Sequence, residues 1–142
     1  MIGIVIWRVW SLVEGAIARG LATTGLGNAG ATGTAFPRGA LPIGRWIALA
    51  AITGWSEEIT FRGDWLRQFS AWTARPTMGV VLQAIVFGIG HAYLGMRPVV
   101  RIAVAAALLG ICAVRIRNLR PLMVTHAWAD VLGGVMVRGL PY

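Results

Sequence analysis

Lysine is absent from this 142-residue chain, cysteine occurs once, and only five residues are acidic. The single cysteine, Cys112, excludes an intramolecular disulfide and any metal site built from two cysteines. Without lysine, the basic excess consists of thirteen arginines, which give the chain a formal net charge of +8. Most of them flank apolar stretches, where cationic residues anchor a membrane protein to lipid headgroups. We therefore expect the lipid bilayer, and not nucleic acid, as the partner of these charges.

Apolar residues make up 57% of the chain and the mean hydropathy is +0.71, both above what soluble proteins typically show. These values predict an integral membrane protein, which we expect in the plasma membrane of a bacterial cell. The length suits a single domain.

Helical spacing of apolar residues, with prolines at first-turn positions, predicts four helices in the second two thirds of the chain. Their expected ranges are Trp46–Trp72, Pro76–Met96, Pro98–Val114 and Pro121–Arg138. Residues 1–22 predict a further apolar or amphipathic helix, either interfacial or spanning, and the Gly- and Thr-rich residues 23–44 predict a loop. The predicted fold is all-α, a polytopic membrane helix bundle whose four-helix catalytic core, residues 45–138, follows an N-terminal apolar helix.

Two adjacent glutamates, Glu57 and Glu58, stand within the first of these four helices, in a stretch otherwise suited to a bilayer. A charged side chain at membrane depth costs roughly 2.5–3.5 kcal/mol on insertion scales, so a neighbouring pair indicates a function. Glu58 lies four residues before Arg62 on one helix face, and we expect the two to pair. Glu57 is turned about 100° away from Glu58, so it does not pair with Arg62 and we expect it to be available as a general base.

The position of Glu57 along its helix predicts a partner for it. Two antiparallel helices joined by a short turn hold a pair of residues at one depth when their midpoint falls in the turn. Glu57 and His91 average to position 74, inside the stretch from Trp72 to Pro76, so we expect them to face each other. The same argument is weaker for His126. Asp130 follows His126 by four residues and can fix its tautomer, orient its ring or complete a ligand set.

Three motifs together resemble the CPBP intramembrane protease family, which includes type II CAAX prenyl endopeptidases and bacterial bacteriocin-processing or immunity proteins. The family pattern is Glu-Glu-x-x-x-Arg, Phe-x-x-x-His and His-x-x-x-Asn/Asp on successive membrane helices. This chain has Glu57-Glu58-Ile-Thr-Phe-Arg62, Phe87-Gly-Ile-Gly-His91 and His126-Ala-Trp-Ala-Asp130, in that order. The resemblance covers residues 45–138 and implies hydrolysis of a peptide bond within or near the bilayer.

The resemblance also implies a role for each motif residue. Glu57 would activate water with His91 as its partner, and His126 with Asp130 would stabilise the oxyanion. Glu58 and Arg62 would hold the site together, and we expect Phe87 to support it by packing in the core.

Two questions stay open at this stage. Two histidines with carboxylates also suit Zn²⁺, so Glu57, His91, His126 and Asp130 form either a metal-free glutamic site or a zinc site. Position 130 is Asp where CAAX-processing members carry Asn, and an ionised Asp only accepts hydrogen bonds.

The chain is accordingly one of two kinds of protein. It is either an endopeptidase that cleaves a membrane-embedded peptide or protein, alone or with a membrane partner protein, or a catalytically silent relative acting in immunity or scaffolding. A haem or proton-transfer protein would leave the Glu-Glu-x-x-x-Arg segment unexplained.

Overall fold

The computed structural model describes residues 43–138 and, before them, Leu12, Ala16, Arg19 and Gly20, which are all helical. Its helices are α2 (Ile43–Glu57), α3 (Leu66–Thr73), α4 (Pro76–Gly90), α5 (Met96–Ile116) and α6 (Arg120–Arg138). This part of the chain contains no strand, which confirms the all-α class. The other residues of the predicted N-terminal helix, 1–22, and most of the predicted loop, 23–44, lie outside the described residues.

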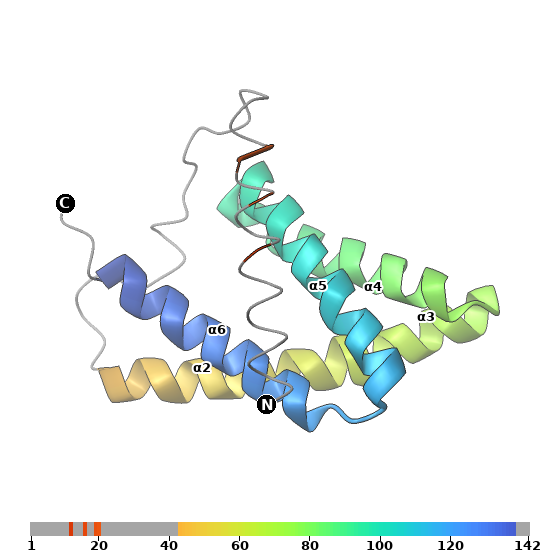
Figure 1. Cartoon of the computed structure of the whole chain (residues 1–142), viewed down its shortest axis with the longest axis horizontal. Coiled ribbons are helices and arrows are strands. Elements are labelled where there is room, and N and C mark those ends of the chain that lie inside the picture. The colour runs from red at the N-terminus through yellow and green to blue at the C-terminus, as the bar shows by residue number, and fades with distance from the viewer. Residues whose placement is uncertain (1–11, 13–15, 17–18, 21–42, 139–142) are drawn as a thin grey trace.

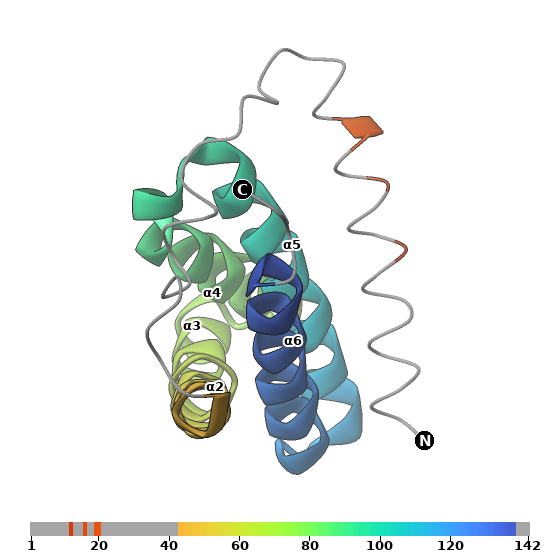
Figure 2. The same cartoon turned by 90° about the vertical axis from the view of Figure 1, so that its left-hand side faces the viewer.

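One long helix is shared by the two halves of the molecule. It comprises α2, the π-helical segment Glu58–Trp65 and α3, with helical backbone angles at both junctions. In Figure 2, viewed from the end at which α2 begins, α3 lies in line behind α2. The first half of this helix packs on α6, and its second half packs on α4, which also packs on α5 (Figure 1).

The predicted helix ranges agree with the structure to within three residues at every end except one. The sequence predicts a helix as far as Met96, but α4 ends at Gly90 and His91 leaves the helix with φ −100° and ψ 15°. A short 3₁₀ turn, Ala92–Leu94, follows, and Gly95 then adopts φ 94°, a conformation that favours glycine. The glycines around His91 lower helix propensity, and this is the physical reason for the early end.

Glycine allows α2 and α6 to approach closely. A Cβ atom added to Gly54 would lie 2.7 Å from the backbone nitrogen of Ala127, and one added to Gly134 would overlap the indole of Trp46. Trp46 is consequently buried between the two helices. The α2–α6 contact therefore depends on small residues, as is common where membrane helices pack.

A buried amide joins α4 to α5. The side chain of Gln83 is fully buried, and its Nε2 donates to the carbonyl oxygens of Val80 at 3.0 Å and Ala106 at 2.9 Å. Gly110 leaves room for this amide, because a Cβ there would lie 2.7 Å from Nε2. The hydrogen bond to Ala106 crosses between the helices and helps fix their register.

Among the described residues, one helix, α5, is long and apolar enough to cross a membrane, and α4 is a shorter apolar helix. The long helix of α2 and α3 has no charged residue between Arg45 and Glu57 and carries several from Glu57 onwards. The polytopic arrangement of the bundle stays a prediction.

Replacing Gly54 with Ala is expected to destabilise the protein by about 1–3 kcal/mol, because the new methyl group meets the backbone of Ala127. The thermal unfolding midpoint in detergent measures the effect. Gly44→Ala is the matched control in the same helix, since a Cβ at Gly44 meets nothing within 4 Å. Equal midpoints for the two variants would contradict the close α2–α6 contact.

Candidate functional site

Glu58 and Arg62 form a buried ion pair where the π-helical segment begins, as their spacing predicts. Arg62 Nη1 lies 2.9 Å from Glu58 Oε1, and both side chains are 0% exposed. Nη1 is close to this oxygen but not aligned for a hydrogen bond. The guanidinium also lies over the ring of Phe87, with Cζ 4.8 Å from the centroid. The buried positive charge is thus compensated by the neighbouring carboxylate and by an aromatic face.

The burial of this pair follows from a stripe that repeats every four residues along the long helix. Its buried members are Trp46, Ala50, Gly54, Glu58, Arg62 and Leu66. In an α-helix each step of four residues advances about 40° beyond a full turn, so such a stripe winds around the helix. It passes from the face covered by α6 to the face covered by α4. Glu58 and Arg62 lie at the middle, in the segment that contacts α4, α5 and α6.

His126 of α6 is oriented by Glu58 on the long helix. The distance from His126 Nδ1 to Glu58 Oε1 is 2.8 Å, and because a carboxylate accepts, Nδ1 carries the hydrogen. On the other side of the ring, Nε2 lies 3.4 Å from Glu57 Oε2 and 3.9 Å from Asp130 Oδ2. The side chains of Glu57 and Asp130 are 24% and 33% exposed. One buried carboxylate therefore holds the imidazole, and two accessible carboxylates flank its other nitrogen.

Asp130 does not take one of the roles that the sequence leaves open for it. Its four-residue spacing from His126 is compatible with fixing the tautomer of the imidazole. In the structure this role belongs to Glu58, which approaches Nδ1 from another helix, while Asp130 lies beside Nε2 at 3.9 Å. Asp130 and Glu57 therefore both lie beside Nε2 of His126.

The polar partners of Glu57 and His91 are other groups, and their facing each other stays a prediction. Among the described residues no hydrogen bond or ion pair joins these two side chains, and the ion-pair partner of Glu57 is His126. The depth argument is consistent with the structure, because Phe61 meets Phe87 across the α3–α4 hairpin with ring centroids 4.7 Å apart. His91 is the C-cap of α4, so its backbone leaves the helix at this point.

His91 is held by the end of its own helix. Its Nδ1 lies 2.8 Å from the carbonyl oxygen of Phe87, so Nδ1 donates and Nε2 is free to accept a hydrogen bond. The buried ring of Phe87 lies between the two histidines, with centroid distances of 4.8 Å to His91 and 6.0 Å to His126. Phe87 therefore supports the site by core packing, as predicted.

Tyr93 is a neighbour of the site that sequence reasoning missed. Its ring stacks on His91 at a centroid distance of 6.1 Å and an interplanar angle of 27°. A continuous helix through residue 96 would have directed Tyr93 to another face. The glycines at 88, 90 and 95 are the signal that could have indicated a turn here.

The described His, Cys, Asp and Glu side chains do not gather into a group of three or more that could hold a metal ion. Glu57, His126 and Asp130 come closest, around one nitrogen, while His91 bonds to the Phe87 carbonyl. In this arrangement the four residues do not form a Zn²⁺ site, because His91 would first have to leave the Phe87 carbonyl, and we assign no chemical step to a metal.

A comparison with protein families gives one match in this region. A family model described as type II CAAX prenyl endopeptidase Rce1-like matches residues 39–132, well over half of the chain. The matched range contains Glu57, His91, His126 and Asp130. Neither the comparison with curated proteins nor the comparison with solved structures gives a match. The family match confirms the resemblance predicted from the three motifs.

Replacing Glu58 with Gln is expected to lower the free energy of unfolding by about 3–5 kcal/mol, because the charge of Arg62 stays buried without its counter-ion. Glu57→Gln, one residue away and partly exposed, is the matched control and should have a much smaller effect. Thermal unfolding in detergent checks both.

A third variant keeps the argument testable if Glu58→Gln fails to fold. Combining Glu58→Gln with Arg62→Met removes both charges and should recover part of the lost stability. If Glu58→Gln and Glu57→Gln unfold at the same temperature, the buried pair is not what stabilises this region.

Proposed function

The chain belongs to the Rce1-like family of type II CAAX prenyl endopeptidases, a family of membrane-embedded proteases, and on this premise we propose that it is an active intramembrane endopeptidase. Its substrate is a membrane-associated peptide or protein, cleaved in the plasma membrane of a bacterial cell, alone or with a membrane partner protein. The observation that carries the proposal is the division of labour around His126. Buried Glu58 orients the ring through Nδ1, and accessible Glu57 lies beside the other ring nitrogen, Nε2.

Glu57 is proposed as the general base. Of the two adjacent glutamates it is the accessible one, since Glu58 is fully buried against Arg62. Glu57 takes a proton from water as the water oxygen attacks the carbonyl carbon of the substrate. The same carboxyl group then gives that proton to the amine that leaves when the C–N bond breaks. His91 Nε2, which can accept a hydrogen bond, is proposed to orient the water.

His126 is proposed to stabilise the oxyanion. With Nδ1 held by Glu58, an N–H at Nε2 points out between Glu57 and Asp130 and can donate to the developing negative charge. The ring is then positively charged, and the flanking carboxylates offset that charge. Asp130, which only accepts hydrogen bonds when ionised, contributes by supporting His126 and not by donating to substrate. This proposal gives Asp130 a different task from that of the Asn in CAAX-processing members.

A catalytically silent relative, acting in immunity or scaffolding, is the competing function. The retention of every charged and imidazole group of the three motifs argues against it. So does the meeting of three carboxylates at one histidine, because three acidic groups at a single site are costly in a low-dielectric region and such a cost indicates a function.

Replacing Glu57 with Gln is expected to reduce cleavage by at least roughly 10²-fold, because the amide cannot take a proton from water. The assay uses purified protein in liposomes with a prenylated CAAX peptide, and thermal unfolding verifies the fold. Asp64→Asn is the control, since Asp64 is an exposed carboxylate on the same helix that accepts from Gln68. Full activity of Glu57→Gln would exclude the proposed mechanism, and an inactive wild type across membrane peptide substrates would favour the silent alternative.

Metal removal tests the metal-free site against the zinc site that the sequence left open, for which His91 would have to leave the Phe87 carbonyl. For the metal-free site we expect cleavage to persist after exhaustive dialysis against a chelator, with less than one zinc per chain by elemental analysis. Stoichiometric zinc that is lost together with activity, and regained with it on adding Zn²⁺, would establish the zinc site. His91→Ala would then also lose the bound zinc.

A further inference from the structure

A basic surface lies at the end of the molecule where α3 turns into α4 and α5 turns into α6. We refer to it as the arginine end, and its members, all exposed, are Arg67, Arg75, Arg115, Arg117 and Arg120. One apolar cluster joins the four helices at this end. It takes Leu66 from α3, Val80 from α4, Ala113 from α5 and Leu122 from α6. The five arginines are thus brought to one end by the packing beneath them.

These positive charges are not neutralised within the described part of the chain. None of the five arginines forms an ion pair with a described carboxylate. Asp64, the acidic residue nearest to Arg67 in the sequence, accepts a hydrogen bond from Gln68 Nε2 at 2.9 Å. The other described carboxylates surround His126. The arginine end therefore has a strong excess of positive charge.

Two of the arginines are unfavourable for the helices that carry them. Arg117 is the C-cap of α5 with φ 54° and ψ 27°, a left-handed conformation that favours glycine or asparagine. Arg120 begins α6, where the positive end of the helix dipole disfavours a cation, and the first turn contains no acidic residue. Arg115, in the last turn of α5, is explained by the dipole of its helix. Arg117 and Arg120 break local rules at one place, which indicates an external partner for their charge.

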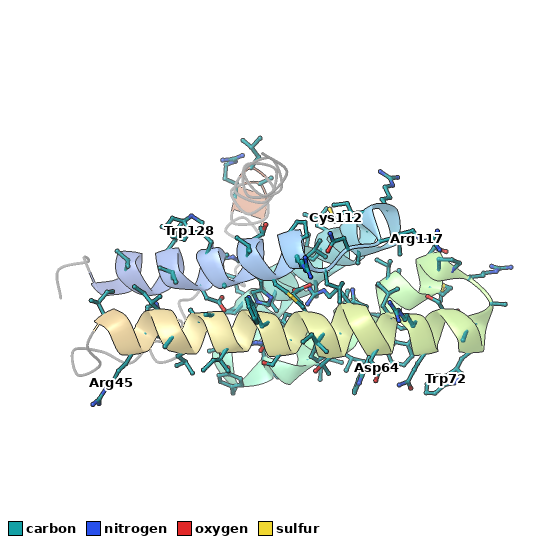
Figure 3. The ribbon with its side chains drawn as sticks, turned by 90° about the horizontal axis from the view of Figure 1, so that it is seen from below. Arg45, Asp64, Trp72, Cys112, Arg117 and Trp128 are labelled. Atoms are coloured by element: carbon teal, nitrogen blue, oxygen red, sulfur yellow. The ribbon has the colours of Figure 1, made fainter. Side chains whose placement is uncertain are left out.

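The opposite end of the molecule differs. Figure 3 shows Arg117 at the Trp72 end of the long helix and Arg45 at the other end. Arg45 is exposed, but Arg97 and Arg101 are only half-exposed and have interactions within the structure. Arg38 and the side chain of Arg138 lie outside the described residues. Of these arginines with described side chains, five exposed ones therefore lie at the arginine end and one, Arg45, lies at the other end.

We propose that the arginine end binds the phosphate headgroups of anionic phospholipids. The planar guanidinium matches phosphate oxygens in pairs, and the surface offers five of them that form no ion pair with a described carboxylate. Trp72, in the last turn of α3, is 74% exposed at the same end. Exposed tryptophan and arginine together at the end of apolar helices are typical of the headgroup region of a bilayer. The apolar helix α5, which is long enough to span a membrane, ends among these arginines.

The experiment is a lipid titration of the purified full-length protein, followed by native mass spectrometry. The probes are phosphatidylglycerol, phosphatidylcholine and water-soluble glycerol phosphate at matched concentrations. Combining Arg115→Gln, Arg117→Gln and Arg120→Gln is expected to weaken phosphatidylglycerol binding on the order of tenfold or more and to leave phosphatidylcholine binding unchanged. Arg45→Gln is the matched control and should stay within about twofold of the wild type, because it removes an exposed arginine from the opposite end.

A single substitution separates lipid binding from folding. Arg117→Gly relieves the left-handed backbone at the end of α5, so the thermal midpoint in lipid-free detergent should not fall. The same variant should bind phosphatidylglycerol more weakly. Phosphatidylglycerol binding by the triple variant at the wild-type level would overturn the proposal. So would an equal loss in Arg45→Gln, or glycerol phosphate binding as tightly as the lipid. None of these outcomes depends on peptidase activity.

Discussion

A carboxylate and a guanidinium that are both removed from water must be covered by protein on every side, since each loses its hydration. For Glu58 and Arg62 this cover comes from α4, α5 and α6, which all contact the π-helical segment. This requirement places the buried pair where the three helices meet the long helix. Because Glu58 also binds His126, the same carboxylate links the stability of the core to the orientation of a catalytic candidate. The loss of Glu58 would affect both together.

The residues around His126 divide by accessibility. Glu58 and Arg62 are buried, whereas Glu57 and Asp130 keep part of their surface. This division suits hydrolysis, because water and substrate have to reach the reacting groups while the groups that orient them stay rigid. It also shows why two glutamates are adjacent. On neighbouring positions of one helix, one side chain can point into the core and the other towards the accessible side of the same imidazole.

Local features of this protein could be predicted from the sequence, and features that depend on distant contacts could not. The Glu58–Arg62 pair follows from i, i+4 spacing, and the helix ends follow mainly from the prolines. The place of His126 does not follow, because its contact with Glu58 joins residues 68 positions apart with no short turn to set the register. The glycines near His91 indicated an early end of α4, but the apolar periodicity predicted a helix that continues to Met96. The sequence contains no signal for the π-helical segment, since its residues are equally compatible with a regular α-helix.

That segment holds more residues than an α-helix of the same rise would, and α2 and α3 continue in line on either side of it (Figure 2). Removing one residue between Glu58 and Arg62 would shorten this segment towards a regular helix and change the i, i+4 spacing of the buried pair. Glu58 and Arg62 would then no longer both point into the core beside His126. A change of one residue in length would thus separate His126 from the carboxylate that orients it.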